Sequence, residues 1–196
     1  MIKKFGGYEA KKSGGSAREI LPAGGYVAKI VSARVDETQY GDKLIVAFDI
    51  AEGDYREFFK RDFDNNTNED KKWRGVYRLN IPADDGSEQD EWRKRSFNNF
   101  AYALEESNNG YAWDWDESKL KGKLFGVLFR NREWEFKGRT GWSTEACSAT
   151  DVKSIRDGKF KTPKDKALNG GARFETTAVP ATTAAGTDDD SGDLPF

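Results

Sequence analysis

The sequence contains no histidine and a single cysteine, Cys147, among its 196 residues. One cysteine excludes a disulfide within the chain, and the absence of histidine excludes a zinc site built from cysteine and histidine. The side chain that most often acts as a general base near neutral pH is therefore missing. No P-loop motif is present either. We therefore expect a binding protein rather than an enzyme, without a cofactor or a metal site.

Long hydrophobic runs are also missing. Residues 1–7 contain no apolar stretch of the length that a signal peptide requires, and no run approaches the roughly 18 apolar residues of a membrane span. Cys147, in a strand-like stretch without a neighbouring histidine, is interpreted as a structural thiol. These features predict a cytoplasmic protein in a reducing setting that does not bind a membrane.

Hydrophobic residues make up 36% of the sequence, whereas aromatic residues make up 13% and include 6 tryptophans. A disordered chain is poor in aromatic residues, so this composition indicates a folded domain. The rings either fill its core or face a partner. The formal net charge is -2, but residues 171–196 carry -4 and residues 1–170 carry +2. A mildly basic body with an acidic tail is compatible with binding to a polyanion.

Composition divides the chain into four parts. Residues 1–24 are rich in Gly, Lys and Ser and are predicted to form a flexible arm, followed by a folded domain over residues 25–160. Residues 161–187 lose hydrophobic periodicity and become rich in Ala, Thr and Pro, which predicts a disordered linker. Residues 188–196 form an acidic tip.

Hydrophobic patterns predict five strands, at 26–35, at 44–50, at 55–63, at 124–129 and at 142–147. Residues 124–129 form a continuous apolar run, and charged residues then alternate with aromatic residues over 133–137. Residues 64–72 are polar and predict a loop, and residues 73–80 fit a short strand or a further loop. Ser87 as N-cap predicts an amphipathic helix over 88–107 whose Phe and Leu residues pack in the core. Three strands, a helix and two strands is the order of an OB-fold, a five-stranded Greek-key barrel. We therefore expect a mainly β protein of that class.

Basic residues alternate with aromatic residues at 55–63, 73–78 and 130–142. Binding of single-stranded DNA without sequence preference requires cations along the phosphates and flat rings on which bases stack. Taken as a strand, the first stretch directs Arg56, Phe58 and Lys60 toward DNA and its other rings toward the core. The competing interpretation places all rings in the core and all charges in solvent.

Trp73 and Trp134 are predicted as the main stacking rings because charged residues flank both. The residues predicted to contact single-stranded DNA are Arg56, Phe58, Lys60, Trp73, Arg74, Tyr77, Arg78, Arg130, Arg132, Trp134, Phe136, Arg139 and Trp142. By contrast, the segment Trp113-Asp114-Trp115-Asp116 is too acidic to bind DNA. It is interpreted either as rings that fasten a loop to the protein or as a contact with a partner.

The acidic tip combines four aspartates with an apolar end. A Phe ring can fill a small apolar pocket, and aspartates attract a basic partner surface. A tail that served only solubility would not need apolar residues at its tip. We predict that partner proteins are bound by Asp188, Asp189, Asp190, Asp193, Leu194, Pro195 and Phe196.

This tip resembles the C-terminus of bacterial and phage single-stranded DNA-binding proteins, in which a linker leads to an Asp cluster and a Pro-Phe or Phe ending. The body is less specifically similar to such proteins of phages and mobile elements, and departs from the bacterial housekeeping form in its polar insertion and long helix. The resemblance implies DNA coating in replication and recombination, recruitment of replication and recombination proteins by the tip, and the host cytoplasm as location. A homo-oligomer is possible in that class.

Two other functions are compatible with the sequence. The first is a protein-binding adaptor of a phage or mobile element that does not bind DNA, which the low net charge of the body favours. The second is a metal-dependent nuclease with Asp62, Asp64 and Glu69 as ligands, although ordinary surface carboxylates explain these residues better.

Overall fold

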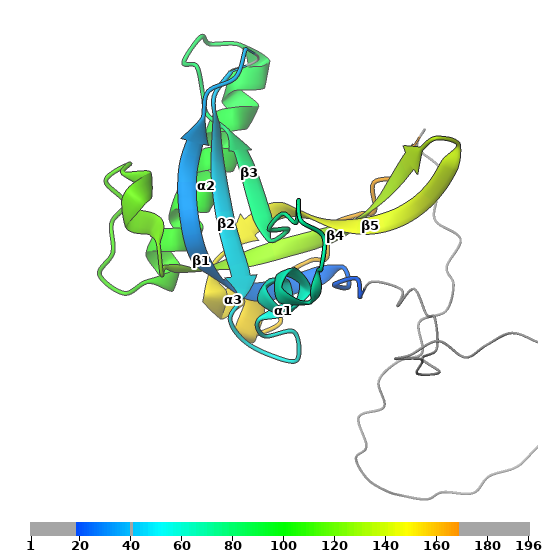
Figure 1. The fold of residues 1–196 in the computed structure, drawn as a ribbon. Coiled ribbons are helices and arrows are strands. Elements are labelled where there is room, and N and C mark those ends of the chain that lie inside the picture. The colour runs from blue at the N-terminus through cyan, green and yellow to red at the C-terminus, as the bar shows by residue number, and fades with distance from the viewer. Residues whose placement is uncertain (1–18, 40, 169–196) are drawn as a thin grey trace, which may run out of the picture.

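A computed structural model of the chain describes residues 19–39 and 41–168 (Figure 1). The described residues form five strands, three α-helices and one short 3-10 helix. In chain order these are β1 (Gly24–Asp36), β2 (Lys43–Ile50), α1 (Phe58–Asn65), β3 (Val76–Asn80), α2 (Glu88–Ser107), η1 (Glu117–Leu120), β4 (Leu124–Phe136), β5 (Arg139–Thr150) and α3 (Val152–Arg156).

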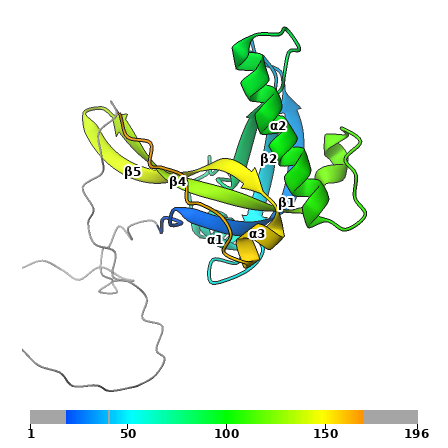
Figure 2. The ribbon, with the colours of Figure 1, turned by 180° about the vertical axis from the view of Figure 1, so that it is seen from behind.

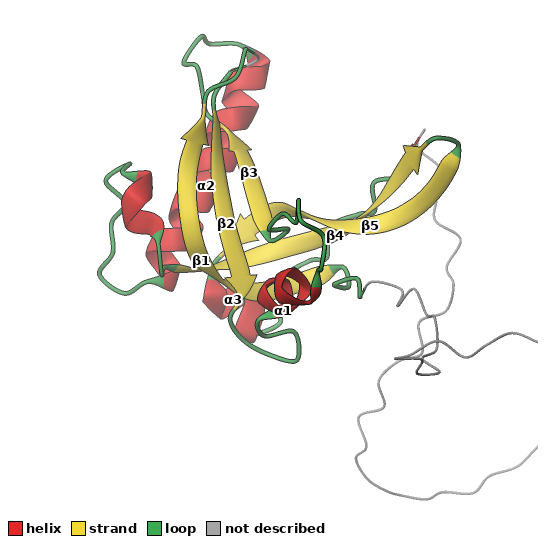
Figure 3. Cartoon of the chain, viewed as in Figure 1, coloured by secondary structure: helices red, strands yellow, loops and turns green. Residues whose placement is uncertain are grey.

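The strands form one antiparallel sheet in the order β3-β2-β1-β4-β5 (Figure 3). The prediction of a mainly β protein with five strands is therefore confirmed. β3 and β5 are the two edge strands, and no ladder of backbone hydrogen bonds joins them in the part of the chain that the structure describes. The sheet is thus open between these two edges, and a closed barrel is not formed.

Aromatic rings fill the core. Phe48 of β2 is fully buried and makes edge-to-face contacts with Phe59 and Phe125, with ring centroids 5.5 and 5.6 Å apart. Phe100 of α2 contacts Phe125 at 5.5 Å and joins the helix to the sheet. Burial of one such ring contributes about 1.5–3 kcal/mol. Figure 2 shows α2 lying across one face of the sheet.

The helix predicted at 88–107 is confirmed, as is its N-cap. The Ser87 hydroxyl accepts a hydrogen bond from the backbone N–H of Asp90 at 3.1 Å. Asp90 is itself fully buried, and its carboxylate accepts from the N–H of Ala83 at 2.7 Å. These two bonds fix the start of α2 against the segment that leaves β3.

The strand predicted at 55–63 is wrong, because this stretch makes a turn and then forms α1. The carboxylate of Asp49 accepts hydrogen bonds from the backbone N–H groups of Phe59 and Lys60 at 2.9 and 3.1 Å. It therefore satisfies donors that the first turn of a helix leaves open. Phe58 and Phe59 are both buried, so the expected alternation of a DNA face and a core face does not exist. The third strand is β3 instead.

β4 and β5 continue past the body of the protein as a long hairpin (Figures 1 and 2). Their pairing runs out to Phe136 and Arg139. The two turn residues, Lys137 and Gly138, have φ angles of 49° and 72°, as expected for the type I′ turn that matches the twist of a hairpin. We refer to residues 130–145 as the β4–β5 arm.

Packing reaches beyond both predicted ends of the folded domain. Leu21, in the range expected to form an arm, is only 2% exposed. After α3, the N–H of Lys166 donates to the carbonyl of Asn131 and the carbonyl of Lys166 accepts from the N–H of Glu133, both at 2.8 Å. The chain thus pairs in parallel with the free edge of the β4–β5 arm. Residues 1–18 of the predicted arm, residues 169–187 of the predicted linker and the acidic tip lie outside the described residues.

Candidate nucleic-acid interface

A groove of about 720 Å³ lies between the two open edges of the sheet. One side is formed by β3 and the other by Thr144–Cys147 of β5 with neighbouring residues of β4. Phe58 and Phe59 of α1 also line the groove, as do Trp92, Arg93 and Ser96 of α2. β3 and β5 are the edge strands of the sheet. The groove exists because the sheet does not close between them.

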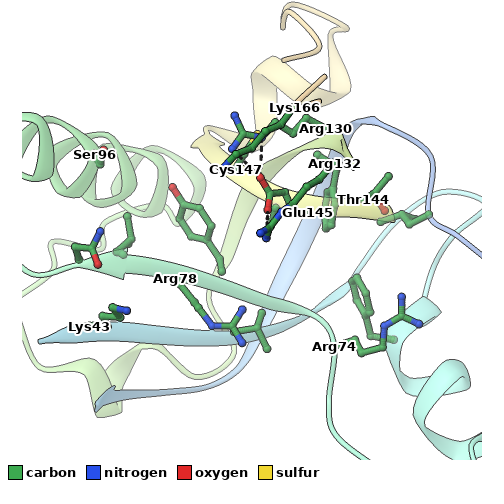
Figure 4. Close-up of a pocket in the computed structure, with 18 of the residues that line it drawn as sticks. Lys43, Arg74, Arg78, Ser96, Arg130, Arg132, Thr144, Glu145, Cys147 and Lys166 are labelled. Atoms are coloured by element: carbon green, nitrogen blue, oxygen red, sulfur yellow. Dashed lines mark hydrogen bonds and ion pairs between the residues drawn. The ribbon is translucent and has the colours of Figure 1, made fainter. Parts of the chain in front are cut away.

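Positive charge is concentrated in this groove. Among its lining residues, seven are cationic and one is acidic; the cations are Lys43, Arg74, Arg78, Arg93, Arg130, Arg132 and Lys166, and the acid is Glu145. Figure 4 shows Lys43, Arg74 and Arg78 on the β2–β3 side, with Arg132 and Glu145 across from them. The groove is therefore far more basic than the overall charge of the chain, as a phosphate track requires.

Glu145 holds two of these cations. One of its carboxylate oxygens accepts from Nε and Nη2 of Arg130 at 2.8 and 2.7 Å, and the other accepts from Nη1 of Arg132 at 3.0 Å. Partial burial tends to raise the pKa of Glu145, but its bonds to Arg130 and the charge of Arg132 outweigh this and lower that pKa. Glu145 is thus ionised at neutral pH and orients both guanidinium groups.

Arg93 carries a donor that needs an acceptor. Its Nε is buried and has no hydrogen-bond partner among the described residues. The side chain reaches toward the turn between β1 and β2, where a Cβ added to Gly41 would lie 3.9 Å from Nη1 of Arg93. Arg93 lines the groove, and a guanidinium group is suited to binding an anionic oxygen.

The rings that line the groove differ in exposure. Phe58 and Tyr77 are only 3% and 4% exposed, so they form its floor, and burial raises the pKa of the Tyr77 phenol. Trp92 is 59% exposed and is the ring that a base can reach. It was not among the predicted contacts. The sequence did hold a signal for its exposure, because Trp92 lies beside the helical stripe of Phe97 and Phe100 and not in it.

The β4–β5 arm extends the groove with a row of cations and rings. Cross-strand pairing places Arg132 opposite Ser143, Trp134 opposite Gly141 and Phe136 opposite Arg139. Because residues two apart in a strand share a face, one face of the arm carries Arg130, Arg132, Trp134, Phe136 and Arg139. These five predicted contact residues therefore lie on one surface, which we call the arm face.

The two rings of the arm face are accessible, with Trp134 41% and Phe136 65% exposed. A Cβ added to Gly141 would lie 2.6 Å from the Trp134 ring, so the ring rests directly on the backbone of the partner strand. Nζ of Lys137 lies 5.3 Å from the centroid of the Phe136 ring. Trp142 pairs with Glu133 on the opposite face, which also carries Glu135, and it is therefore separated from this row.

Trp73 has a different role from the one predicted. It is half-buried, and its indole N–H donates to the carbonyls of Phe48 and Gly75 at 3.0 and 3.1 Å. Its ring packs near Phe63, with centroids 5.8 Å apart. These contacts hold Trp73 against the body of the protein, and Trp73 does not line the groove, so we leave it out of the candidate interface.

Arg56 and Lys60 do not reach the groove. They line a separate pocket of about 600 Å³, together with Lys29, Lys121 and the carboxylates of Asp49 and Glu57. Lys60 is paired with Asp64 one helical turn away, with Nζ and Oδ2 2.5 Å apart. The strand prediction assigned both cations to a DNA-binding face, whereas the turn at 54–57 and α1 place them in this separate pocket.

Two of the three candidate ligands of a nuclease site, Asp62 and Asp64, are engaged in ion pairs. Asp62 contacts Arg74 at 3.4 Å and Asp64 contacts Lys60. Within residues 19–39 and 41–168, no group of three or more acidic or thiol side chains is placed to hold a metal ion. In the same residues, no helix is both long and apolar enough to cross a membrane. Cys147 lines the groove half-buried, and burial raises the pKa of its thiol.

Comparison with known protein families and with curated protein sequences gives no match to this chain. Its function is therefore inferred from the residues of the groove and the arm face. Lys43, Trp92, Arg93 and Lys166 are members of this surface that the sequence pattern missed. Lys166 carried no signal, because it lies in a stretch without periodicity.

Proposed function

We propose that the protein binds single-stranded DNA without sequence preference, through the groove and the arm face. The observation that carries this proposal is the concentration of seven cations and one carboxylate in the groove. Accessible rings accompany these cations, with Trp92 beside the groove and Trp134 and Phe136 on the arm. Cations for phosphates and open rings for bases are the two requirements of such binding.

We further infer that the sheet is an OB-fold opened between β3 and β5. The strand order β3-β2-β1-β4-β5, with α2 between β3 and β4, supports this assignment. OB-folds bind oligonucleotides on the face of strands 2 and 3 and between the loops that follow strands 1 and 4. The groove borders β3, Arg93 reaches toward the β1–β2 turn, and the arm is an elongated form of the β4–β5 loop.

The energetics of the proposed surface are sufficient for binding. Stacking contributes on the order of 1–3 kcal/mol per base, so bases on Trp92, Trp134 and Phe136 would supply roughly 3–9 kcal/mol before ordering costs. Contacts to about four phosphates would give a slope of roughly -3 in a plot of log affinity against log salt. Binding should therefore be measurable at low salt and should weaken steeply as salt is added.

The same proposal assigns partner recruitment to residues 188–196, whose sequence combines aspartates with Leu194 and Phe196. A protein that coats single strands and also carries a tip for other proteins would act in replication and recombination. This assignment rests on the sequence pattern and its resemblance to single-stranded DNA-binding proteins, since the tip lies outside the described residues.

The test is a titration of the full chain with labelled oligo-dT and with duplex of the same length, at low and moderate salt. We expect at least tenfold preference for the single strand, quenching of tryptophan fluorescence, and at least fivefold weaker binding of Arg78→Ala. Lys153→Ala is the matched control, because Lys153 is an exposed cation on α3 that does not line the groove. Equal binding of duplex, or equal effects of the two substitutions, would refute the proposal.

A protein-binding adaptor is a second candidate, and one observation favours it. β3 and β5 both border the groove as edge strands, and an extended peptide can add to such an edge by backbone hydrogen bonds. An adaptor without DNA binding predicts that neither single strand nor duplex binds at low salt. The titration described above therefore separates the two functions.

A further inference from the structure

A second pocket, of about 340 Å³, lies where the ends of β1 and β3 meet the loop before η1. Its lining is apolar except for one carboxylate, and consists of Val35, Leu44, Ile81, Pro82, Phe97, Trp113, Trp115 and Glu117. We call it the tryptophan pocket. It shares no lining residue with the groove, so it is a separate site.

Three stacked rings form one wall of the tryptophan pocket. Trp113 lies 5.9 Å from Phe97 and 5.0 Å from Trp115, measured between ring centroids, and the planes are tilted by 16° and 29°. Trp113 is buried, whereas Trp115 is 64% exposed. Trp115 also has a backbone φ angle of 68°, which residues other than glycine rarely adopt. A large ring is thus held in a constrained position with much of its surface in water.

Carboxylates predominate around the tryptophan pocket. Asp114, Asp116 and Glu117 flank Trp115, Asp36 follows Val35, and Asp84 follows Pro82 by two residues. Three nearby cations are engaged with these carboxylates: Arg34 pairs with Asp36, Lys94 with Asp84, and Lys119 with Asp114 and Asp116. Arg93 lines the groove. Lys43, next to Leu44, lines the groove instead. An apolar pocket with an acidic rim fits an apolar side chain flanked by basic residues.

One segment of this chain has that chemistry. Residues 1–18 contain Lys3, Lys4, Lys11, Lys12 and Arg18 against one acidic residue, Glu9, and they include the apolar residues Ile2, Phe5 and Tyr8. The acidic tip has the opposite charge, so the rim of the pocket would repel it. We propose that the segment Ile2–Tyr8 docks in the tryptophan pocket, with the Phe5 ring against Trp115 and with Lys3 and Lys4 at the acidic rim.

The length of the chain permits this docking. About 14 residues separate Phe5 from Glu19, and they span at most about 46–50 Å when extended. The pocket lies at the far end of β1, and the 11 residues from Gly24 to Val35 cover roughly 36 Å. The segment can therefore reach the pocket of its own chain only when nearly extended, whereas the pocket of a second copy imposes no such limit. The docking does not depend on DNA binding.

Photo-cross-linking of the full chain tests this proposal. With p-benzoylphenylalanine in place of Phe5, irradiation should cross-link residues 1–8 to peptides that contain Ile81–Pro82 or Trp113–Glu117. A mixture of ¹⁴N- and ¹⁵N-labelled protein shows whether the link joins one chain or two, and either form supports the docking. The matched control carries the probe at Phe196 and should give no link to the pocket.

Two substitutions make the test specific. In Trp115→Asn the new residue tolerates the left-handed backbone, and the cross-link yield should fall at least fivefold. The control is Tyr102→Asn, because Tyr102 is an exposed ring on α2 outside the pocket, and it should leave the yield unchanged. Reversing Lys3 and Lys4 to Glu should lower the yield at low salt. Circular dichroism melting curves verify that each variant is folded. An unchanged yield in Trp115→Asn, links only to other surfaces, or a link to the pocket from Phe196 alone would overturn the proposal.

Discussion

Replacement of Glu145 by Gln separates a DNA-binding role of the groove from a purely structural one. Glu145 is the one carboxylate among the described residues that line the groove, and it neutralises Arg130 and Arg132. Gln keeps the size of the side chain but removes its charge. If phosphates bind in the groove, the substitution should tighten DNA binding, because it removes a repulsive charge and releases two guanidinium groups.

The size of the effect follows from the geometry. Two unit charges about 4 Å apart interact by about 1 kcal/mol in water and about 4 kcal/mol at an effective dielectric constant of 20. The Glu145 side chain is 25% exposed and that of Arg132 is 53% exposed, so the lower part of this range applies. We expect a gain of about 1.4 kcal/mol, which is about tenfold in affinity at low salt.

The salt dependence provides an independent measure of the same effect. Each phosphate neutralised on a single strand adds about 0.7 to the magnitude of the slope of log affinity against log salt. Release of Arg130 and Arg132 should therefore steepen this slope by about 0.7–1.4. The assay is fluorescence anisotropy with labelled oligo-dT, repeated over a series of salt concentrations.

Glu135→Gln is the matched control for this experiment. Glu135 lies on the opposite face of the β4–β5 arm and is exposed, so its replacement changes the net charge equally without releasing an arginine. If both substitutions tighten binding to the same extent, only the overall charge matters and the reasoning is wrong. Weaker binding of Glu145→Gln with an unchanged salt slope would show that Glu145 serves only to position the arginines.

Three further predictions concern stability, the arm and the tip. Because the folded-state pKa of Glu145 is lowered, its ion pairs stabilise the protein above the ordinary glutamate pKa of about 4.3 and are lost as the pH falls through the folded-state value. Glu145→Gln should therefore lower the melting temperature at pH 7 by about 2–4 °C, and this difference should shrink as the pH falls through that folded-state value. Gly141→Ala should push the Trp134 ring off the arm, since the added Cβ would lie 2.6 Å from it, and should weaken oligo-dT binding about threefold or more with little change in melting temperature. Deletion of residues 188–196, which carry four aspartates, should raise DNA affinity at low salt if the tail competes for the basic body, and equal affinity at every salt concentration would exclude that competition.

Local patterns predicted most of the strands and the long helix. β1, β2 and α2 follow from alternation, from helical spacing and from the Ser87 cap, all of which act between residues close in sequence. The helix α1 could not be predicted in this way. Its first turn is capped by Asp49, ten residues earlier on a neighbouring strand, so a tertiary contact overrides the alternating pattern of the segment.

The candidate site was predicted in part, for a related reason. Arginines from two distant stretches, Arg74 and Arg78 in one and Arg130 and Arg132 in the other, do line the same groove. Which rings remain exposed depends on packing that no local pattern encodes, so Trp73 was predicted as a main stacking ring and Trp92 was not predicted as a contact. Both assignments would have required knowledge of the strand order.

The overall charge of -2 is a poor guide to what this protein binds, because its charges are sorted by location. Many cations outside the groove are matched by nearby carboxylates, as in the pairs of Lys60 with Asp64 and Arg156 with Glu52. The groove retains a local excess of positive charge, whereas the rim of the tryptophan pocket is acidic. A polyanion and a basic segment would therefore be directed to different surfaces of the molecule and would not compete for either.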